Sequence, residues 1–425
     1  MRITARAGVP VAAALVVAAV VAGVPALATQ AGPGRATGPA GVTWSPALTS
    51  GDGTGVLVRD GRARLDPRRA FVAPAATGVR TGAAEGGADL TRTGLLTLPV
   101  RRLGTATGEV VTHVDADSLT GATVDVRGRQ PSGNWSEWLP ADRDGRVRLP
   151  APTDEVQARL VLTGQPGPAV SAVTLTARPG AATQGIPATA GTPLQYRVFA
   201  TREGLVGGTT ANGHVILPDD RFVALPSRRA LSPRGSSDYS VKVCAANGRC
   251  AFAPVWDVGP WNTQDDYWSP PAQRERWSDL PQGRPEAQAA FRSGYHGGTD
   301  GYGRRVANPA GIDLGDGIFR GALGLKDNAT VTVTYLWTGN TRLAKVVANS
   351  AVDVLGAPRT GAAVVGSAAR GAGVPVTCSV TAGTARFLQI GIGQFVRAEA
   401  VPDAGSTPPC TSGTAAPGGL LGAAG

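Results

Sequence analysis

Two carboxylates are the best candidates for chemistry in this sequence. Asp257 lies in the run VWDVGP (255–260), and Asp313 lies in GIDL (311–314). Apolar neighbours remove water from a carboxyl group and favour its protonated form, so such an acid can donate a proton near neutral pH. Cleavage of a glycosidic bond requires a general acid of this kind. The pair indicates acid-assisted cleavage of a polysaccharide, with Asp257 as general acid and Asp313 as the orienting or charge-stabilising group.

The same two aspartates also fit a purely structural role. Gly259, Gly311 and Gly315 flank them. Aspartates at strand ends commonly accept hydrogen bonds from glycine-rich turns and so hold loops in place without any substrate. Both interpretations of Asp257 and Asp313 stay open at the level of sequence.

Aromatic side chains gather beside Asp257 and in the segment that follows it. Four of the eight tryptophans are Trp256, Trp261, Trp268 and Trp277, and Tyr295 follows them. Exposed indole rings can stack on sugar rings, which gives a candidate substrate-binding platform. The alternative is that these rings form the core of a segment with few other apolar side chains.

Other residue types restrict the chemistry. The histidines are His113, His214 and His296, and no Cys-x-x-Cys pair occurs, so we expect no metal. No phosphate loop or nucleophile elbow occurs either, so we expect no cofactor. Asp265, Asp266 and His296 are candidate replacements for a second catalytic group.

The charge of the chain points to an anionic partner. The formal net charge is +10, carried almost wholly by arginine, but no run of basic residues appears. The charge itself names no partner, but without a basic run a polyanionic cell wall is at least as plausible as nucleic acid. We expect a cell-wall polysaccharide such as peptidoglycan as the partner, and no nucleic acid. The sequence leaves the oligomeric state open.

Short strands must position the candidate residues. Alternation places Asp257 on the same face as Val255, and it places Asp313 opposite Ile312 and Leu314. A helix is expected at 285–292, inside an insertion at 261–310. The strands are expected at 194–200, 214–216, 222–225, 239–243, 251–255, 311–314 and 330–337.

The order of the central motifs carries a family resemblance. The chain resembles the double-psi β-barrels of rare lipoprotein A, of expansin-like proteins and of the three-aspartate domain of membrane-bound lytic transglycosylase A. The resemblance implies a closed six-stranded barrel over 193–338, with Asp257 in the place of a functional aspartate and Asp313 in the place of a later acid. The families' histidine and first acid fall near Leu225 and Pro226, where this chain has neither. The motifs are TANG (210–213), FVALPS (222–227), YSVKV (239–243), PVWDVGP (254–260) and GIDL (311–314).

Two further β-rich regions flank the central one. Short alternating runs over 42–178 are typical of a β-sandwich, and with NWSEW (134–138) they resemble the jelly-roll accessory module of exported actinobacterial cell-wall hydrolases. Residues 179–192 are low in charge and in bulky side chains, so we expect a linker. Residues 341–402 resemble a bacterial Src-homology-3-like domain, with Phe387 where that family often has tryptophan.

The first 28 residues predict an export signal. Arg2 and Arg6 precede an apolar stretch, and ALA (26–28) supplies a small-residue cleavage motif. Gly23 and Pro25 keep the stretch below the roughly 20 residues of a membrane-spanning helix, so we expect no stable membrane anchor. The mature protein would be secreted, extracellular or cell-wall associated, with a flexible segment at 29–41 and a tail at 403–425.

Four cysteines in an exported chain can form two disulfides. Cys244 and Cys250 are spaced to face each other across a hairpin whose turn contains Gly248, so they are expected to pair. Cys378 and Cys410 then pair by elimination.

These observations predict an all-β protein with an N-terminal β-sandwich, a central six-stranded double-psi β-barrel with a long insertion, and a C-terminal Src-homology-3-like β-barrel. The favoured function is binding of peptidoglycan or a related polysaccharide through the central barrel, with weak catalysis or none, because the catalytic partner positions are empty. The alternatives are a lytic transglycosylase with Asp257 as general acid and a scaffold for other exported proteins.

Overall fold

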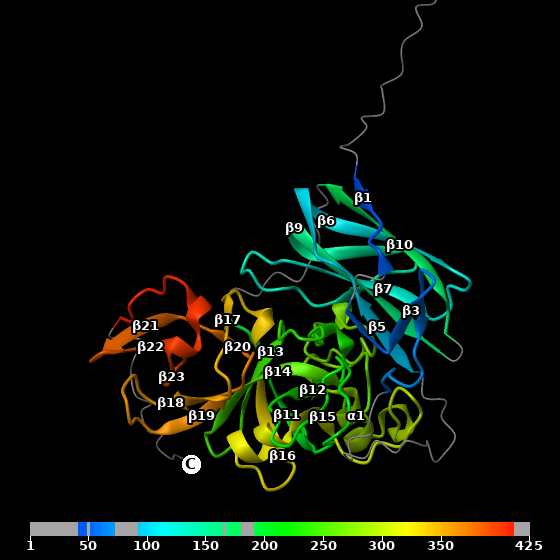
Figure 1. Cartoon of the computed structure of the whole chain (residues 1–425). Coiled ribbons are helices and arrows are strands. Elements are labelled where there is room, and N and C mark those ends of the chain that lie inside the picture. Colours follow the sequence, from blue (N-terminus) through cyan, green and yellow to red (C-terminus); the bar gives the residue numbers. More distant parts are fainter. Residues whose placement is uncertain (1–40, 49–51, 73–91, 165–166, 180–190, 412–425) are drawn as a thin grey trace, which may run out of the picture. The chain divides into compact units, whose positions relative to one another are not determined.

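The computed structural model describes residues 41–48, 52–72, 92–164, 167–179 and 191–411 (Figure 1). These residues all belong to one compact unit, residues 40–425. The expected signal peptide, residues 29–40 of the expected flexible segment, most of the expected linker and the end of the expected tail lie outside the described residues.

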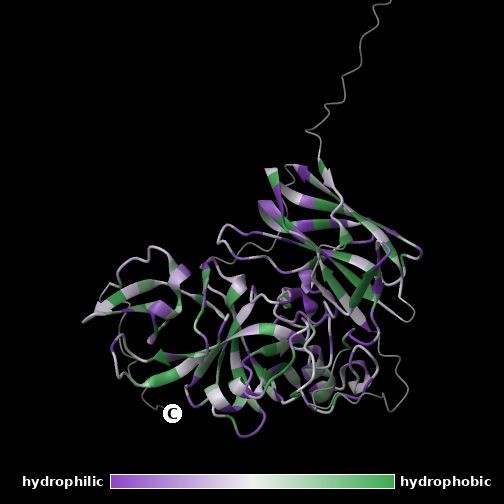
Figure 2. Cartoon of the chain, in the orientation of Figure 1, coloured by the Kyte–Doolittle hydropathy of each residue, from purple (hydrophilic) through white to green (hydrophobic). Residues whose placement is uncertain are grey.

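The N-terminal part forms one ten-stranded sheet around a single core. Strand β9 joins its two sides, because its first half pairs with β6 and its second half pairs with β5 and β7. Hydrophobic and hydrophilic bands alternate along these strands (Figure 2), as expected for strands with one buried face. The strands are β1 (Val42–Trp44), β2 (Asp52–Thr54), β3 (Val56–Arg59), β4 (Arg62–Leu65), β5 (Thr93–Thr97), β6 (Arg101–Ala116), β7 (Ala122–Gly128), β8 (Leu139–Pro140), β9 (Arg146–Thr163) and β10 (Val170–Pro179).

Six central strands close into a barrel, which confirms the six-stranded barrel expected from the sequence. The order around the ring is β11-β15-β12-β14-β13-β16, and β16 pairs with β11 to close it. The pairs β11–β15 and β12–β14 are parallel, and the other four pairs are antiparallel. The strands are β11 (Leu194–Glu203), β12 (Val223–Leu225), β13 (Ser240–Cys244), β14 (Cys250–Val258), β15 (Ala310–Gly315) and β16 (Ala329–Tyr335).

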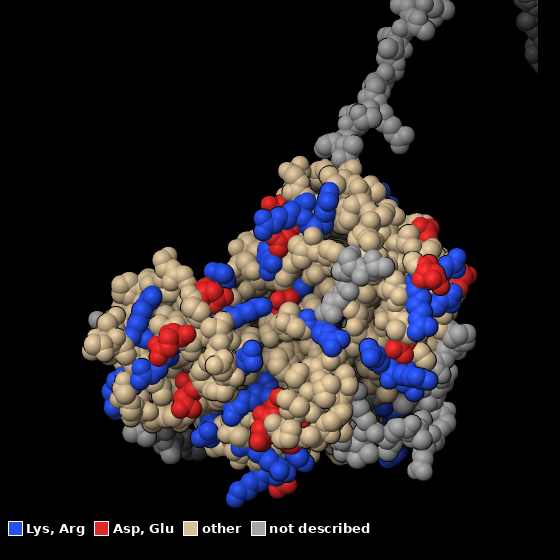
Figure 3. All heavy atoms as spheres, viewed as in Figure 1, with Lys and Arg blue, Asp and Glu red and all other residues tan. Residues whose placement is uncertain are grey.

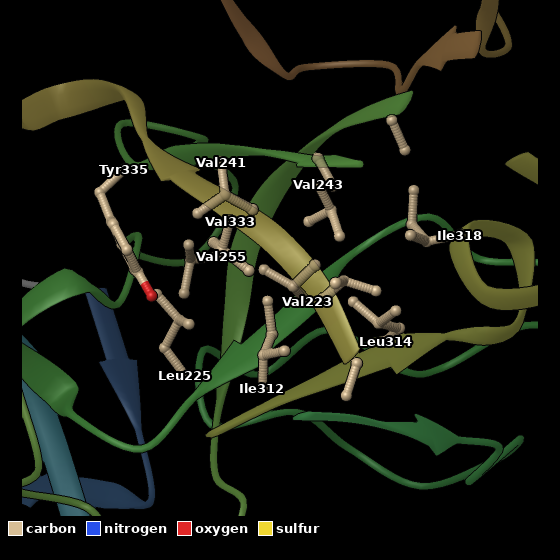
Figure 4. Close-up of a cluster of buried hydrophobic side chains, with 14 of the residues drawn as sticks. Val223, Leu225, Val241, Val243, Val255, Ile312, Leu314, Ile318, Val333 and Tyr335 are labelled. Atoms are coloured by element: carbon tan, nitrogen blue, oxygen red, sulfur yellow. The ribbon is translucent and has the colours of Figure 1, made fainter. Parts of the chain in front are cut away.

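Alternating side chains of these strands fill the barrel. Val223, Val255, Ile312 and Leu314 point into one buried cluster (Figure 4). One expected strand is wrong: residues 214–216 form no strand, and Val215 makes only a single bridge with Thr209. That segment belongs instead to the loop between β11 and β12.

The insertion carries the helix predicted from its proline and glycine boundaries. Helix α1 (Glu286–Ser293) follows Pro285 and ends at Gly294, whose φ of 62° lies in the left-handed region that glycine favours. The Asp265 carboxylate accepts a hydrogen bond from the Glu286 backbone N–H at 2.7 Å and so caps the helix N-terminus. Short helical turns elsewhere are Arg228–Ala230, Pro271–Gln273, Tyr295–Gly298, Gly317–Ala322, Leu336–Thr338, Ala398–Ala400 and Pro402–Ala404.

The C-terminal part continues the barrel sheet. Strand β19 pairs in parallel with β14, and a Cβ atom on Gly366 would lie 2.0 Å from the Cys250 carbonyl oxygen, so only glycine permits this approach. The predicted disulfides Cys244–Cys250 and Cys378–Cys410 are both confirmed. The strands are β17 (Leu343–Lys345), β18 (Val352–Leu355), β19 (Val364–Ala368), β20 (Gly373–Pro375), β21 (Cys378–Ala382), β22 (Ala385–Gly391) and β23 (Gln394–Arg397).

The all-β class is therefore confirmed in all three parts. In the part of the chain that the structure describes, no helix is long and apolar enough to cross a membrane.

Candidate functional site

In the structure, Asp257 and Asp313 lie on the two strands that flank the same residue, Ala224 of β12. Ala224 of β12 is the register partner of Asp257 on β14 and of Asp313 on β15. Register partners project from the same face of a sheet, so the side chains of Asp257, Asp313 and Ala224 all project from one face of the barrel wall. Two positions that are 56 residues apart in the sequence therefore become near neighbours.

That side is the outer face of the barrel. Asp313 alternates with Ile312 and Leu314, which fill the interior. On β14 the register slips at Trp256: Val255 pairs with Val223, but Asp257 pairs with Ala224, so the strand carries one extra residue. The expected alternation, which placed Asp257 with Val255, is wrong because this irregularity turns Asp257 outwards.

Asp257 is fully buried and holds the loop between β11 and β12. Its Oδ1 atom accepts hydrogen bonds from the backbone N–H groups of Ala211 at 2.7 Å and Val258 at 2.8 Å. Ala211 belongs to the run TANG, one of the motifs expected around the site. The contact is the loop-holding one that strand-end aspartates commonly make.

Asp313 is 5% exposed and accepts a hydrogen bond from the Thr201 hydroxyl on β11. Burial raises the pKa of Asp313 to about 7, the Thr201 hydrogen bond opposes this rise, and the negative charge of Asp257 adds to it. Near neutral pH, Asp313 therefore holds a proton for much of the time.

Neither carboxylate is open to a polymeric substrate in this conformation. A general acid must come within hydrogen-bond reach of the oxygen that it protonates. Asp257 and Asp313 instead face donors of the protein itself, beneath the loop that Ala211 anchors. The pair can hold a proton and order this wall of the barrel.

Three of the candidate platform tryptophans lie in cores. Trp261, Trp268 and Trp277 are 2%, 1% and 8% exposed. Trp268 stacks on Tyr335, with ring centroids 5.1 Å apart. Buried rings offer no face to a sugar, so the structure corrects the platform interpretation for these three residues and supports the interpretation as core.

Trp256 and Tyr295 are only partly buried. The Trp256 ring lies 4.7 Å from the His214 ring, and its indole donates to the Ser236 carbonyl oxygen at 3.2 Å. Tyr295 donates to both carboxylate oxygens of Asp279, at 2.9 and 3.1 Å, and stacks on His296. Each ring has a partner within the protein.

The acids of the insertion support its structure. Asp265 pairs with Arg274, and Asp266 pairs with Arg229 and accepts the Glu275 backbone N–H at 2.8 Å. Burial raises the pKa of Asp265 to about 6 against the opposing charge of Arg274. His296, the other candidate replacement for a catalytic group, lies in the turn Tyr295–Gly298, in which no residue is buried.

Among the described residues, no group of three or more His, Cys, Asp or Glu side chains could hold a metal ion.

The sequence analysis missed how the run NWSEW docks on the barrel. Trp135 and Trp138 belong to the barrel core, and the Trp138 indole donates to the Leu231 carbonyl oxygen at 3.1 Å. Between them in sequence, Glu137 accepts the indole N–H groups of Trp268 at 2.6 Å and Trp337 at 3.0 Å. Two tryptophans of the N-terminal part therefore pack in the core of the barrel, while the N-terminal sheet keeps a core of its own.

Buried charges reinforce this junction. The Arg159 guanidinium lies 2.7 Å from Asp125 and 4.6 Å from the Trp138 ring, and it donates to the Arg228 carbonyl oxygen. Burial disfavours the charged form of Asp125, but Arg228 and Arg159 outweigh that effect and lower its pKa. The alternation of residues in the strands predicted that their inward faces are apolar. It did not predict that charged residues are buried between the N-terminal sheet and the barrel.

The C-terminal module contains an open groove with a volume of about 520 Å³. Val352, Leu355 and Val364 supply apolar lining, while Asp353 and Arg397 supply opposite charges. The Arg397 side chain is 43% exposed, lies 3.7 Å from the carboxylate of Glu399, which also lines the groove, and donates to the Thr360 hydroxyl at 3.2 Å. The volume of the groove falls in the range of ligand pockets, and the residues that line the groove suit a ligand with both apolar and charged groups.

Comparison with known proteins gives a family match that covers the barrel. Residues 194–334 match a family described as a domain of unknown function (DUF8814). The match begins with the first residue of β11 and ends one residue before the end of β16, so it spans the barrel and its insertion. No curated protein and no solved structure gives a significant match to the chain.

Proposed function

We propose that this chain is an exported, cell-wall-associated protein that binds peptidoglycan or a related polysaccharide without cleaving it. The observation that carries the proposal is the burial of both barrel acids. Asp257 is bonded to the Ala211 and Val258 backbone, and Asp313 to the Thr201 hydroxyl. Carboxylates that make such contacts stabilise the local structure of the protein. They do not come within hydrogen-bond distance of a glycosidic oxygen. Binding then takes place at open pockets elsewhere on the chain.

The C-terminal groove is the proposed contact with the wall. Peptidoglycan carries short peptides with charged ends and small apolar side chains, and the groove combines those features in complementary form. Arg397 faces a carboxylate of the ligand, Asp353 faces an amine, and Val352 and Leu355 contact its methyl groups. Charge-assisted hydrogen bonds of this type are roughly twice as strong as neutral ones, so the two charged residues should dominate the affinity.

Co-sedimentation with purified, insoluble peptidoglycan tests the proposal. The mature protein should pellet with the wall material. The double variant Arg397→Gln/Asp353→Asn should bind about tenfold more weakly or worse, since one charge-assisted hydrogen bond contributes about 1.5–3 kcal/mol. Arg370→Gln is the matched control, because it removes one exposed arginine of the same module outside the groove.

Each outcome has a defined meaning. Failure of the wild-type protein to pellet would contradict wall binding itself. Pelleting of the double variant at the wild-type level, with Arg370→Gln also unchanged, would contradict the groove as the contact.

One observation favours the enzymatic alternative. Asp313 has a pKa raised to about 7 and lies beside a second carboxylate, as two-acid chemistry requires. A lytic transglycosylase built on this pair would have to lift the loop that Ala211 anchors before Asp257 reached a substrate. Release of anhydro-muropeptides that disappears in Asp257→Asn would establish this alternative.

A further inference from the structure

A second pocket opens between the N-terminal sheet and the barrel. Its volume is about 460 Å³. On one side lie Thr54, the last residue of β2, and the turn after β4 that contains Arg68 and Arg69. On the other side lie Thr209, in the loop between β11 and β12, and Arg234. Neither the proposed wall contact nor the barrel acids use this pocket.

Three arginines line this pocket, with few carboxylate partners among the described residues. Arg68, Arg69 and Arg234 are exposed. Asp66 lies 4.0 Å from the Arg69 guanidinium, and it accepts a hydrogen bond from the Arg68 backbone N–H rather than from the Arg68 guanidinium. Among the residues that the structure describes, neither the Arg68 nor the Arg234 guanidinium has a carboxylate partner. Lys and Arg are elsewhere interspersed with acids on the face shown in Figure 3.

The other residues that line the pocket provide hydroxyl groups and small areas of apolar surface. Thr54 and Thr209 supply hydroxyl groups, and Val56 and the 53%-exposed Val215 supply apolar surface. At Gly213 the two modules come so close that a Cβ atom would lie 3.1 Å from the Thr54 hydroxyl and 3.5 Å from Arg234 Cδ. The pocket walls are therefore held together by packing between the modules.

We propose that this pocket binds an anionic polymer of sugar or polyol units through its phosphate or carboxylate groups. Guanidinium groups present paired N–H donors that match both kinds of oxyanion. The hydroxyl of Thr54 bonds the polymer's own hydroxyls, and Val56 and Val215 contact its C–H faces. A volume of about 460 Å³ lies in the range for ligands of several units rather than a single small anion.

Titration calorimetry on the full mature chain tests this site with defined probes. The probes are a short poly(glycerol phosphate), a polyglucuronate of equal charge, inorganic phosphate and a single-stranded DNA of equal charge. One or both of the first two polymers should bind, more weakly at high salt because exposed charges are screened. Their comparison decides between phosphate and carboxylate as the recognised group.

Paired variants locate the binding. Arg68→Gln/Arg234→Gln should weaken polymer binding about 100-fold, because each lost charge-assisted hydrogen bond corresponds to about tenfold in affinity. Arg62→Gln/Arg64→Gln is the matched control, since it removes two exposed arginines of β4 outside the pocket, and it should change affinity less than about twofold. All four side chains are exposed, so both variants should fold, and their melting temperatures check this.

Three results would overturn the inference. They are no binding of either polymer, equal weakening by the two double variants, and equal or tighter binding of the DNA, which would identify the site as one for nucleic acid. The inference does not rest on the proposed wall contact, because the probes are soluble and the pocket shares no lining residue with the C-terminal groove.

Discussion

Replacing Asp313 with Asn should make the protein more stable above pH 7. The side chain of Asn has the shape of a protonated aspartic acid and can accept the same hydrogen bond from Thr201. Wild-type Asp313 has a pKa of about 7 in the folded protein, against a usual value of 3.8. The folded chain therefore holds a proton that the unfolded chain has already released.

The sign and size of the effect follow from this difference. The folded state binds more protons than the unfolded state between about pH 4 and pH 7, so the free energy of unfolding falls as pH rises through that window and remains low above it. Each pKa unit corresponds to about 1.4 kcal/mol, so the loss reaches at most about 4 kcal/mol. Asp313→Asn does not titrate, and it should escape this loss.

Urea unfolding at pH 5 and pH 8, followed by tryptophan fluorescence, measures the effect. The stability difference between Asp313→Asn and wild type should grow in favour of the variant by about 1–3 kcal/mol between these pH values. Asp144→Asn, at an exposed turn position, should show no such change. A variant that loses stability with pH as steeply as wild type would refute the assignment of the proton to Asp313.

Three further predictions concern the cores and the disulfides, and urea unfolding of each variant measures them all. Trp138→Ala should destabilise the protein by about 3–5 kcal/mol, because Trp138 is fully buried where the N-terminal part meets the barrel; a loss below about 1 kcal/mol would contradict the packing of Trp138 in the barrel core. Arg159→Met should cost about 3 kcal/mol, since it removes one of the cations that compensate the buried charge of Asp125, and an unchanged midpoint would contradict that role. Cys378→Ser/Cys410→Ser should cost about 3–4 kcal/mol by releasing a loop closed over a separation of 32 residues, provided that the wild-type protein is kept oxidised.

Local patterns were sufficient to predict most of the strands and the Cys244–Cys250 disulfide, which left Cys378 and Cys410 to pair by elimination. Alternating residues in β11, β13 and β16 place their apolar side chains in the barrel as expected, and the spacing of Cys244 and Cys250 matches the hairpin that they close. These features depend on neighbours within a few positions, which the sequence displays directly.

Features that depend on distant contacts could not be predicted in this way. The slip at Trp256 reflects pairing with β12, and it reversed the face of Asp257. The burial of Trp268 depends on Tyr335 and on Glu137 from another module, so its residue type alone could not distinguish an exposed platform from a core. The three-arginine pocket likewise forms only where Arg234 meets the turn after β4.

Digestion of purified peptidoglycan by the mature protein tests the central claim most directly. Chromatography and mass spectrometry of the soluble fraction should detect no anhydro-muropeptides, while the protein itself is recovered with the insoluble wall. Anhydro-muropeptides that appear with wild-type protein, and vanish when Asp257 is replaced by Asn, would contradict a non-cleaving binding protein.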